Sequence, residues 1–389
     1  MNCQNLTIKY QELLNLQAEF QQILSDFQKM KPSTMAQRDQ VAKSLKDLQG
    51  KIQNLITTEF TKLPDFKFNE TQKTLQEQYA SIINIYKNND LIDQNDAIKN
   101  PFPDLVEKGI AKSFPFPTER QIRAELRRSE RKDFCELKIK QGFTRIQITP
   151  IIPLSQIIET LKSVTLKHED NLFDAQKDKT AKKTKLTVNK NQPVWFQEDE
   201  YGNNADLNND IIYYINKFPD RVDDGTGNTT TELYNQTKHG GLTKKELLLQ
   251  SLKTPFPGYI VELKQENQLI PRKNKASTTH GRKNLETKKS PEDCLKEIQI
   301  KQEYQGESLT TIDSEIINAI ISLEESNGVI RDFQNSNDAA CFAAGTYLRH
   351  HDYVPSFYWI RDELQFSVGG ASFSGPNSGA SVASSARLG

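Results

Sequence analysis

The chain has 389 residues, with 51 basic and 51 acidic side chains and therefore a formal net charge of zero. This balance argues against a protein that is basic throughout and holds nucleic acid by charge alone. Only 35% of the residues are hydrophobic and the mean hydropathy is −0.68, so we expect long helices or exposed loops beside the globular core.

Targeting and cysteine patterns point to a reducing compartment. No stretch approaches the roughly 18 apolar residues of a membrane span, and the N-terminus lacks the basic and apolar regions of a signal peptide. The four cysteines, Cys3, Cys135, Cys294 and Cys341, lie far apart without a CxxC pair. We therefore expect a cytoplasmic protein with no membrane span, no disulfide framework and no cysteine-based metal site.

The first hundred residues have coiled-coil-like spacing. Leu13, Phe20 and Phe27 repeat every seven residues, and Pro32 separates this arm from the next. Apolar residues then follow in steps of 4, 3, 4 and 3, and again in a third arm: Val41, Leu45, Leu48, Ile52 and Leu55, then Leu75, Tyr79, Ile82 and Tyr86. We predict a helical arm over residues 1–98, either an intrachain antiparallel bundle or a stalk that forms homo-oligomers.

Four prolines mark the next segment as a linker, residues 99–117: Pro101, Pro103, Pro115 and Pro117. Because such a linker shares little core with its neighbours, removal of residues 1–98 is expected to leave a folded domain. The predicted domain spans residues 118–389 and belongs to the α+β class.

Its elements follow from periodicity and turn signals. Helices are expected over 119–132, 154–167, 243–252, 290–302 and 310–327, the third opened by a capping box of Thr243 and Glu246. Strands are expected over 134–148 with a break at Gly142, over 194–196, 259–263 and 339–347. Lysine-rich residues 174–190 read as a loop.

Motifs for common chemistries are missing. The sequence has no HExxH, no GxxxxGK[ST] and no GxSxG, so we predict no enzyme and no cofactor. The acidic segment 199–224 does not have the EF-hand spacing and reads as a polar loop more readily than as a cation site. Basic segments 120–132 and 272–289 could contact phosphate, although solvated charge is the commoner explanation.

The last stretch, residues 353–389, organises the domain. Residues 357–368 have the aromatic and β-branched content of a strand, with Trp359 and Phe366 as its largest apolar side chains. Residues 369–385 contain only Gly, Ala, Ser, Val, Phe, Pro and Asn. We predict short strands and tight turns that return to the core, with Trp359 buried; the alternative is a disordered tail.

This segment resembles C-type-lectin-fold proteins, and more closely the branch shared by formylglycine-generating-enzyme-like domains and the variable proteins of diversity-generating retroelements. The resemblance rests on Tyr358-Trp359-Ile360-Arg361, on Gly369-Gly370 and on SVASSARL at 381–388. Ala383 and Ser384 depart from the usual Gly-Val-Arg or Gly-Phe-Arg. The segments PFPGYIVEL, GRKNLE and YQGESLT are similar to bacterial proteins with the same ending.

The resemblance implies a C-type-lectin-like subdomain at about 303–389, non-catalytic, with changeable side chains on its last strands and Trp359 as scaffold. We therefore predict a module that binds a protein or a cell-surface ligand. The candidate contacts are polar or aromatic residues near the terminal strands: Ser356, Tyr358, Arg361, Glu363, Gln365, Ser367, Ala371, Phe373 and Asn377. The alternatives are an assembly protein that oligomerises through its arm, and nucleic-acid binding through the basic segments.

The composition of the tail suggests how it could vary. Errors at adenine convert an AAC codon into any NNC codon, and every residue from Phe366 to Ala386 belongs to the set that NNC encodes. We hypothesise that residues 357–385 are diversified by adenine-directed mutagenesis. Selection for small residues in tight turns predicts a similar bias.

Overall fold

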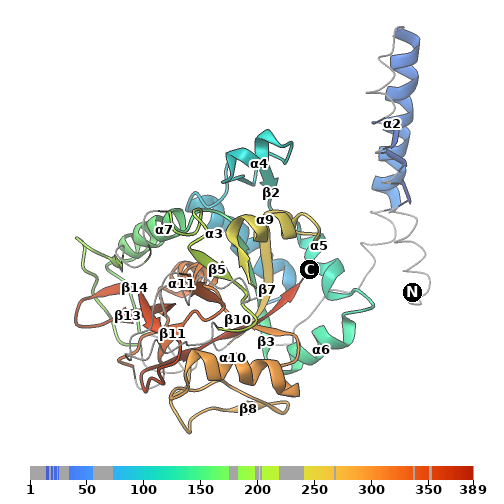
Figure 1. The fold of residues 1–389 in the computed structure, drawn as a ribbon. Helices are drawn as coiled ribbons and strands as arrows, with labels where there is room; N and C mark the ends of the chain where they lie inside the picture. Colours follow the sequence, from blue (N-terminus) through green and yellow to red (C-terminus); the bar gives the residue numbers. More distant parts are fainter. Residues whose placement is uncertain are drawn as a thin grey trace, which may run out of the picture. The chain divides into compact units, whose positions relative to one another are not determined.

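The fold was obtained as a computed structural model (Figure 1). It describes residues 35–55, 73–174, 183–197, 204–218, 241–266, 269–335, 338–349 and 353–388, with Tyr201 and a few helical residues between positions 15 and 25. The chain forms two compact units, Met1–Phe66 and Lys67–Gly389.

In the first unit, the second predicted arm is the helix α2, Met35–Leu55. Its seam is less exposed than the residues between: Leu48 is buried, and Val41, Leu45 and Ile52 are half-buried. The spacing of 4 and 3 therefore selects one face of the helix, as predicted. Most of the first predicted arm falls outside the described residues.

The third predicted arm, helix α3 (Leu75–Asn88), belongs to the second unit and not to the arm. It contacts strand β3 (Phe143–Pro150) and helix α11 (Ile312–Ser326). The Gln78 amide binds the carbonyl of Thr144 and the N–H of Ile146, both at 2.9 Å. The boundary between the units thus precedes α3, because periodicity shows that a helix has an apolar face but does not identify its partner.

The proline-rich segment predicted as a linker is folded onto the same core. Strand β1 (Ala97–Lys99) pairs with β2 (Ser113–Pro115), and helix α4 (Pro103–Glu107) lies between them in sequence. The Phe116 ring meets Tyr86 of α3 edge-on at 5.4 Å and Tyr259 at 5.5 Å. The prolines therefore shape a packed connection instead of separating two domains.

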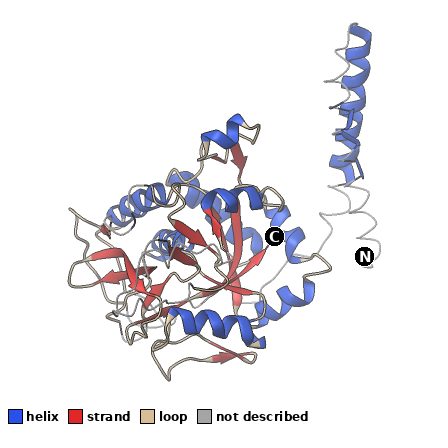
Figure 2. Ribbon diagram, viewed as in Figure 1, coloured by secondary structure: helices blue, strands red, loops and turns tan. Residues whose placement is uncertain are grey.

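Two sheets form the main layers of the second unit, shown as red arrows in Figure 2. The four-stranded sheet is antiparallel and has the order β10–β16–β7–β3, with β10 at Glu307–Leu309, β16 at Ser384–Leu388 and β7 at Tyr259–Gln265. The five-stranded sheet is mixed and has the order β15–β11–β13–β14–β4: Ala380–Val382, Ala340–Phe342, Tyr353–Ile360, Gln365–Ser372 and Val194–Phe196. The smaller sheets are β12–β5–β6 (Thr346–Leu348, Ile211–Tyr213, Leu242–Thr243) and β8–β9 (Thr278–Thr279, Arg282–Lys283).

Helix α11 is the central element of this unit. It contacts β3 of one sheet, β13 of the other, and helices α3 and α7 (Leu154–Lys167). Its N-cap is Thr311, whose hydroxyl accepts from Ser314 N, and it ends at Asn327 in the left-handed region with φ 55°. The remaining helices are α5 (Glu119–Leu126), α6 (Lys132–Lys140), α9 (Lys244–Ser251), α10 (Pro291–Ile300) and the 3-10 helix η4 (Gln302–Tyr304).

The α+β class is confirmed, and so are α7, α9, α10, α11, β4 and β7 near the predicted bounds. The capping box of Thr243 and Glu246 is present on α9. The prediction of strand from residue 134 was wrong for its first half. Residues 132–140 form α6, which buries Cys135 and Lys138 three positions apart; the chain then turns at Gly142, with φ 90°, into β3.

The C-terminal stretch returns to the core as predicted. Its last strand, β16, lies between β10 and β7 in the four-stranded sheet. Trp359 is fully buried and meets Phe366 edge-on at a ring distance of 5.0 Å. Through residue 388, therefore, the small residues of the tail build strands of both sheets.

Candidate functional site

The side chains of β13 and β14 alternate between two faces, and the predicted contact residues of these strands lie on one of them. The strands pair with Ser356 opposite Gly369, Tyr358 opposite Ser367 and Ile360 opposite Gln365. Since successive side chains in a strand point to opposite faces, these six residues share one face. The other face carries residues that are fully buried: Phe357, Trp359, Phe366 and Val368.

Strand β4 extends the first of these faces with Trp195. Its register places Trp195 opposite Ser367. A Cβ built on Gly369 would lie 3.3 Å from Cζ3 of Trp195 and 3.5 Å from Oγ of Ser356. The indole therefore lies against Gly369 and close to Ser356. We call Trp195, Ser356, Tyr358, Ile360, Gln365, Ser367 and Gly369 the outer face.

The edge of the outer face is held by two side chains that follow β4. Gln197 accepts a hydrogen bond from Gly370 N through Oε1 at 3.1 Å, and the Tyr201 hydroxyl donates to the carbonyl of Gly369 at 2.9 Å. Both bonds fix the backbone of β14 at its two consecutive glycines. Trp195 and Tyr358 are half-buried, and Tyr358 packs against the core cluster that contains Phe342, Val354 and Phe373. Only the remaining part of each side chain is open to a partner.

Two polar atoms of the outer face have no hydrogen-bond partner among the described residues. They are Oγ of Ser367 and Oε1 of Gln365, and both are buried. The amide nitrogen of Gln365 donates to Glu363. Because most buried polar atoms in folded proteins are paired, these two atoms are open to a hydrogen bond from a water molecule or another small group.

Tyr358 and Arg361 are held from one side by residues 332–334. The Tyr358 ring meets Phe333 edge-on at 5.3 Å. Arg361 forms a two-point ion pair with Asp332, with Nε to Oδ1 at 3.0 Å and Nη2 to Oδ2 at 2.6 Å. The guanidinium is therefore engaged within the domain, and it fixes the turn that ends β13.

The structure brings some of the nine predicted residues together and separates others. Ser356, Tyr358, Gln365, Ser367 and Ala371 share one face of β13 and β14 by alternation, and Arg361 and Glu363 lie in the turn between these strands. Phe373 is 1% exposed and stacks on Phe218 at 4.7 Å, so it serves the core. Asn377 is exposed, and its Oδ1 accepts from Gly379 N at 2.7 Å.

Sequence reasoning missed Trp195, Ile360 and Gly369 as members of this surface. The short strand 194–196 was expected, but nothing in the sequence identifies β14 as its neighbour, more than 160 residues further along. The local signal was a large aromatic residue on a strand of three residues, which is too short to show on its own which face is buried.

Many basic side chains of the two segments considered for nucleic acid are paired inside the domain. Arg123 pairs with Glu119, and Arg128 with Glu130 at 2.8 Å. In the second segment, Arg282, Lys283 and Lys289 pair with carboxylates: Glu307, Glu286 and Glu297. Such pairing reduces the charge that these segments can offer to phosphates.

Thiol and metal chemistry find little support in the described part of the chain. Burial raises the pKa of Cys294 and of Cys341 to about 12 and that of Cys135 to about 11, which disfavours a reactive thiolate. Within that part, no three His, Cys, Asp or Glu residues are grouped to hold a metal. The acidic segment 199–224 lies partly outside it, and Asp206 is paired with Lys244 at 2.6 Å.

None of the helices that the structure describes has an apolar run long enough to cross a membrane. Comparisons with models of protein families, with curated proteins and with solved structures gave no match for this chain.

Proposed function

We propose that the protein is a non-catalytic binding module and that its outer face contacts a protein or a cell-surface ligand. The observation that carries this proposal is the combination of two half-buried aromatic side chains, Trp195 and Tyr358, with Oγ of Ser367 on the strand between theirs. This buried oxygen has no hydrogen-bond partner among the described residues. Aromatic rings supply large contact areas at small entropic cost, and a nearby hydroxyl adds hydrogen bonding.

The outer face is a surface on rigid strands and not a loop. The opposite side of the same strands is packed by Phe357, Trp359 and Phe366, with Phe357 stacked on Phe366 at 5.3 Å. Side chains on such a support are held in place before a partner arrives, which lowers the entropy lost on binding. This supports the proposal of a C-type-lectin-like subdomain at about 303–389, in which Trp359 is scaffold.

Binding can be tested with the labelled full-length protein on a glycan array and against a random peptide library. The double variant Trp195→Ala, Tyr358→Ala should weaken any specific binding about thirtyfold or more, because central aromatic anchors contribute at least about 2 kcal/mol. Ile300→Ala is the matched control, since Ile300 is an apolar residue that is 80% exposed at the end of α10. Binders that tolerate the double variant would rule out the outer face as the site.

A second candidate function is assembly through the N-terminal unit. The reduced exposure of Val41, Leu45, Leu48 and Ile52 along α2 favours a helical seam. Light scattering after size-exclusion chromatography distinguishes a stalk from an intrachain bundle: Leu45→Asp should convert an oligomer to a monomer, whereas a chain that is monomeric from the start excludes the stalk.

A further inference from the structure

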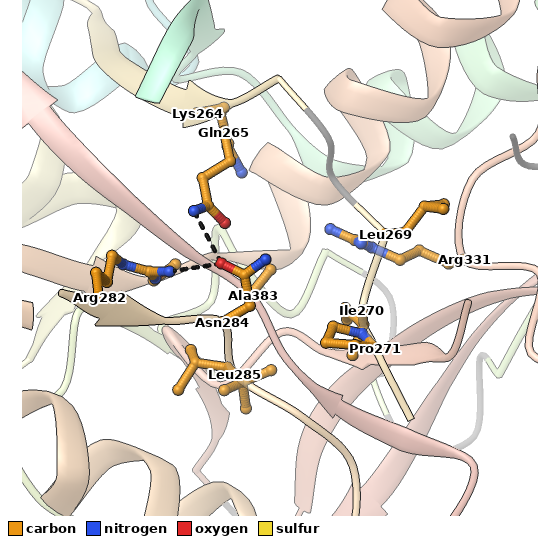
Figure 3. Close-up of a pocket in the computed structure, with 12 residues that line it drawn as sticks. Lys264, Gln265, Leu269, Ile270, Pro271, Arg282, Asn284, Leu285, Arg331 and Ala383 are labelled. Carbon is orange, nitrogen blue, oxygen red and sulfur yellow. Dashed lines mark hydrogen bonds between the residues drawn. The ribbon is translucent and has the colours of Figure 1, made fainter. Parts of the chain in front are cut away.

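A small cavity lies where β15 passes into β16, at Ala383 (Figure 3). It offers about 30 Å³ to the centres of water-sized molecules, which is room for about two waters or one group of similar size. Part of the lining is apolar: Ile270, Pro271, Leu285 and Val382. Leu269, Pro271 and Asn284 are half-exposed, so the cavity has a side that faces solvent. It does not involve the outer face, and the following inference is independent of the proposed function.

Three buried cations line this cavity: Lys264, Arg282 and Arg331, which are 3%, 1% and 1% exposed. None of the lining residues is an Asp or a Glu. Figure 3 shows Arg282 and Gln265 on one side, with Asn284 accepting hydrogen bonds from both, and Arg331 beside Leu269 and Ile270. A cavity with this lining favours an anion.

The carboxylates that balance these cations are each shared by two of them. Glu315 binds Arg331 at 2.7 Å and Lys264 at 3.3 Å. Glu307 binds Arg282 at 2.8 Å and Lys138 at 2.7 Å. Both carboxylates are fully buried, so each group of three carries one surplus positive charge.

Two further buried carboxylates set the remaining charge. Asp338 acts on Arg331 and accepts the backbone N–H groups of Ile270, Ala339 and Asp332. It offsets one of the two surplus charges. Glu262, the next residue on the Lys264 face of β7, is fully buried and accepts hydrogen bonds from Ser314 and Ser385 at 2.7 Å each, and its charge offsets the other. The carboxylates that balance these cations therefore lie outside the lining, and the cavity itself presents the cationic side chains.

Lys264 has hydrogen-bonding capacity to spare. An ammonium group has three donors, and among the residues that the structure describes the one hydrogen bond of Lys264 is the 3.3 Å contact with Glu315. Lys138 shares Glu307 with Arg282 as Lys264 shares Glu315 with Arg331, but it makes three hydrogen bonds, to Gln141, Glu303 and Glu307. Lys264 is therefore the cation best placed to bind an added anion.

We propose that this cavity binds the carboxylate group of a small monoanion, with Lys264 as principal donor. The attached hydrocarbon chain then leads past the apolar residues toward the side that faces solvent, because the cavity holds only a group of about the size of the carboxylate. The small volume favours a carboxylate over a phosphate, which is larger and carries more charge. Such a carboxylate could belong to a free short-chain acid or to a peptide C-terminus.

The test is ligand-observed saturation-transfer NMR on the full chain. The probes are butyrate and its neutral counterpart butyramide, together with the peptide Gly-Gly-Val with a free or an amidated C-terminus. We expect saturation of butyrate and not of butyramide. If only the free-ended peptide is bound, the source is a peptide C-terminus; if neither butyrate nor that peptide binds at tens of millimolar, the proposal is overturned.

Variants locate the binding. Lys264→Met should weaken it about tenfold or more, the loss of one charge-assisted hydrogen bond, whereas Lys138→Met removes an equally buried ammonium that does not line the cavity and should change it less than about threefold. Ala383→Leu fills the cavity without removing a charge and should abolish binding. This variant replaces the lysine variant as the test if the lysine variant does not fold. Undiminished binding by folded Lys264→Met or Ala383→Leu protein would refute the assignment.

Discussion

Helix α3 is the element whose removal most sharply tests the domain boundary. A chain that begins at residue 67 keeps α3, whereas a chain that begins at residue 99 loses it. Four large side chains of α3 are at most 7% exposed: Leu75, Ile82, Ile85 and Tyr86. Burying each contributes roughly 1.5–3 kcal/mol, or about 6–12 kcal/mol together. Since whole domains are stable by about 5–15 kcal/mol, the shorter chain should not fold.

Urea unfolding followed by far-UV circular dichroism measures this difference. The chain 67–389 is expected to unfold cooperatively, and the chain 99–389 should show no cooperative transition or be recovered as aggregate. A cooperative transition of 99–389 at the same urea concentration as that of 67–389 would refute the reasoning. It would mean that α3 contributes little to the core and would restore the boundary expected from the sequence.

Three further perturbations test the core. Trp359→Ala should lower the free energy of unfolding by about 3–5 kcal/mol in urea, whereas half-buried Trp195→Ala should cost clearly less. Gly345→Ala should be destabilising by about 1–3 kcal/mol or more in the same assay, because the added Cβ would approach the Leu309 carbonyl oxygen, and an unchanged midpoint would contradict this close approach. Burial raises the pKa of Glu315, but Arg331 and Lys264 outweigh it and bring the pKa to about 2, so this carboxylate stabilises the fold above about pH 4.5 and loses that effect as the pH falls toward 2. Glu315→Gln should therefore flatten the dependence of stability on pH between about 2 and 4.5 relative to the unmodified chain.

The sequence predicted those elements whose deciding contacts join residues only a few positions apart. The Thr243 and Glu246 capping box opens α9 because its bonds join residues three positions apart. Helix α11 could be predicted in the same way, because Thr311 caps its first turn and Asn327 adopts the left-handed conformation that ends it. Trp359 could be placed in the core from its strand context, although the strand that packs beside it could not be named.

The failures share a physical cause, which is that the deciding contacts are distant in sequence. Residues 134–140 alternate like a strand, with Leu137 and Ile139 on one side, but Leu137 is 44% exposed in α6. The buried residues of α6 are Cys135 and Lys138, and the ammonium of Lys138 pairs with Glu307 nearly 170 positions later. A buried lysine does not mark a helix face in any hydrophobic pattern.

The candidate site could be predicted only in part, because some of its contacts are local and others join residues that are distant in sequence. Alternation along β13 and β14 places Ser356, Tyr358, Gln365 and Ser367 on one face once the two strands are paired. The pairing with β4, and with it Trp195, depends on a parallel neighbour from the middle of the chain. Phe373 has the aromatic character of a contact residue, but its partner Phe218 makes it part of the core.

The composition of the tail now has two explanations that apply to different residues. The serines of β15 and β16 have structural partners: Ser381 binds the Glu286 carbonyl at 2.8 Å, Ser384 binds Glu307 at 2.6 Å and Ser385 binds Glu262 at 2.7 Å. Each is buried and bonds to a carbonyl or a carboxylate, and a residue without a hydroxyl would leave that buried acceptor without this bond.

Residues 370–379 can therefore tolerate diversification far better than residues 380–386. All residues of the first range except Phe373 are exposed or half-buried. If adenine-directed mutagenesis acts on this gene, an imperfect downstream repeat should differ from the coding copy almost only at adenines, with a reverse-transcriptase gene nearby. Sequencing of the gene and its repeat in independent isolates should show variation within 370–379 and constancy at Ser381, Ser384 and Ser385. Substitutions spread evenly over both ranges would contradict the structural limit. A gene without repeat or reverse transcriptase would exclude the hypothesis and leave tight packing as the cause of the small residues.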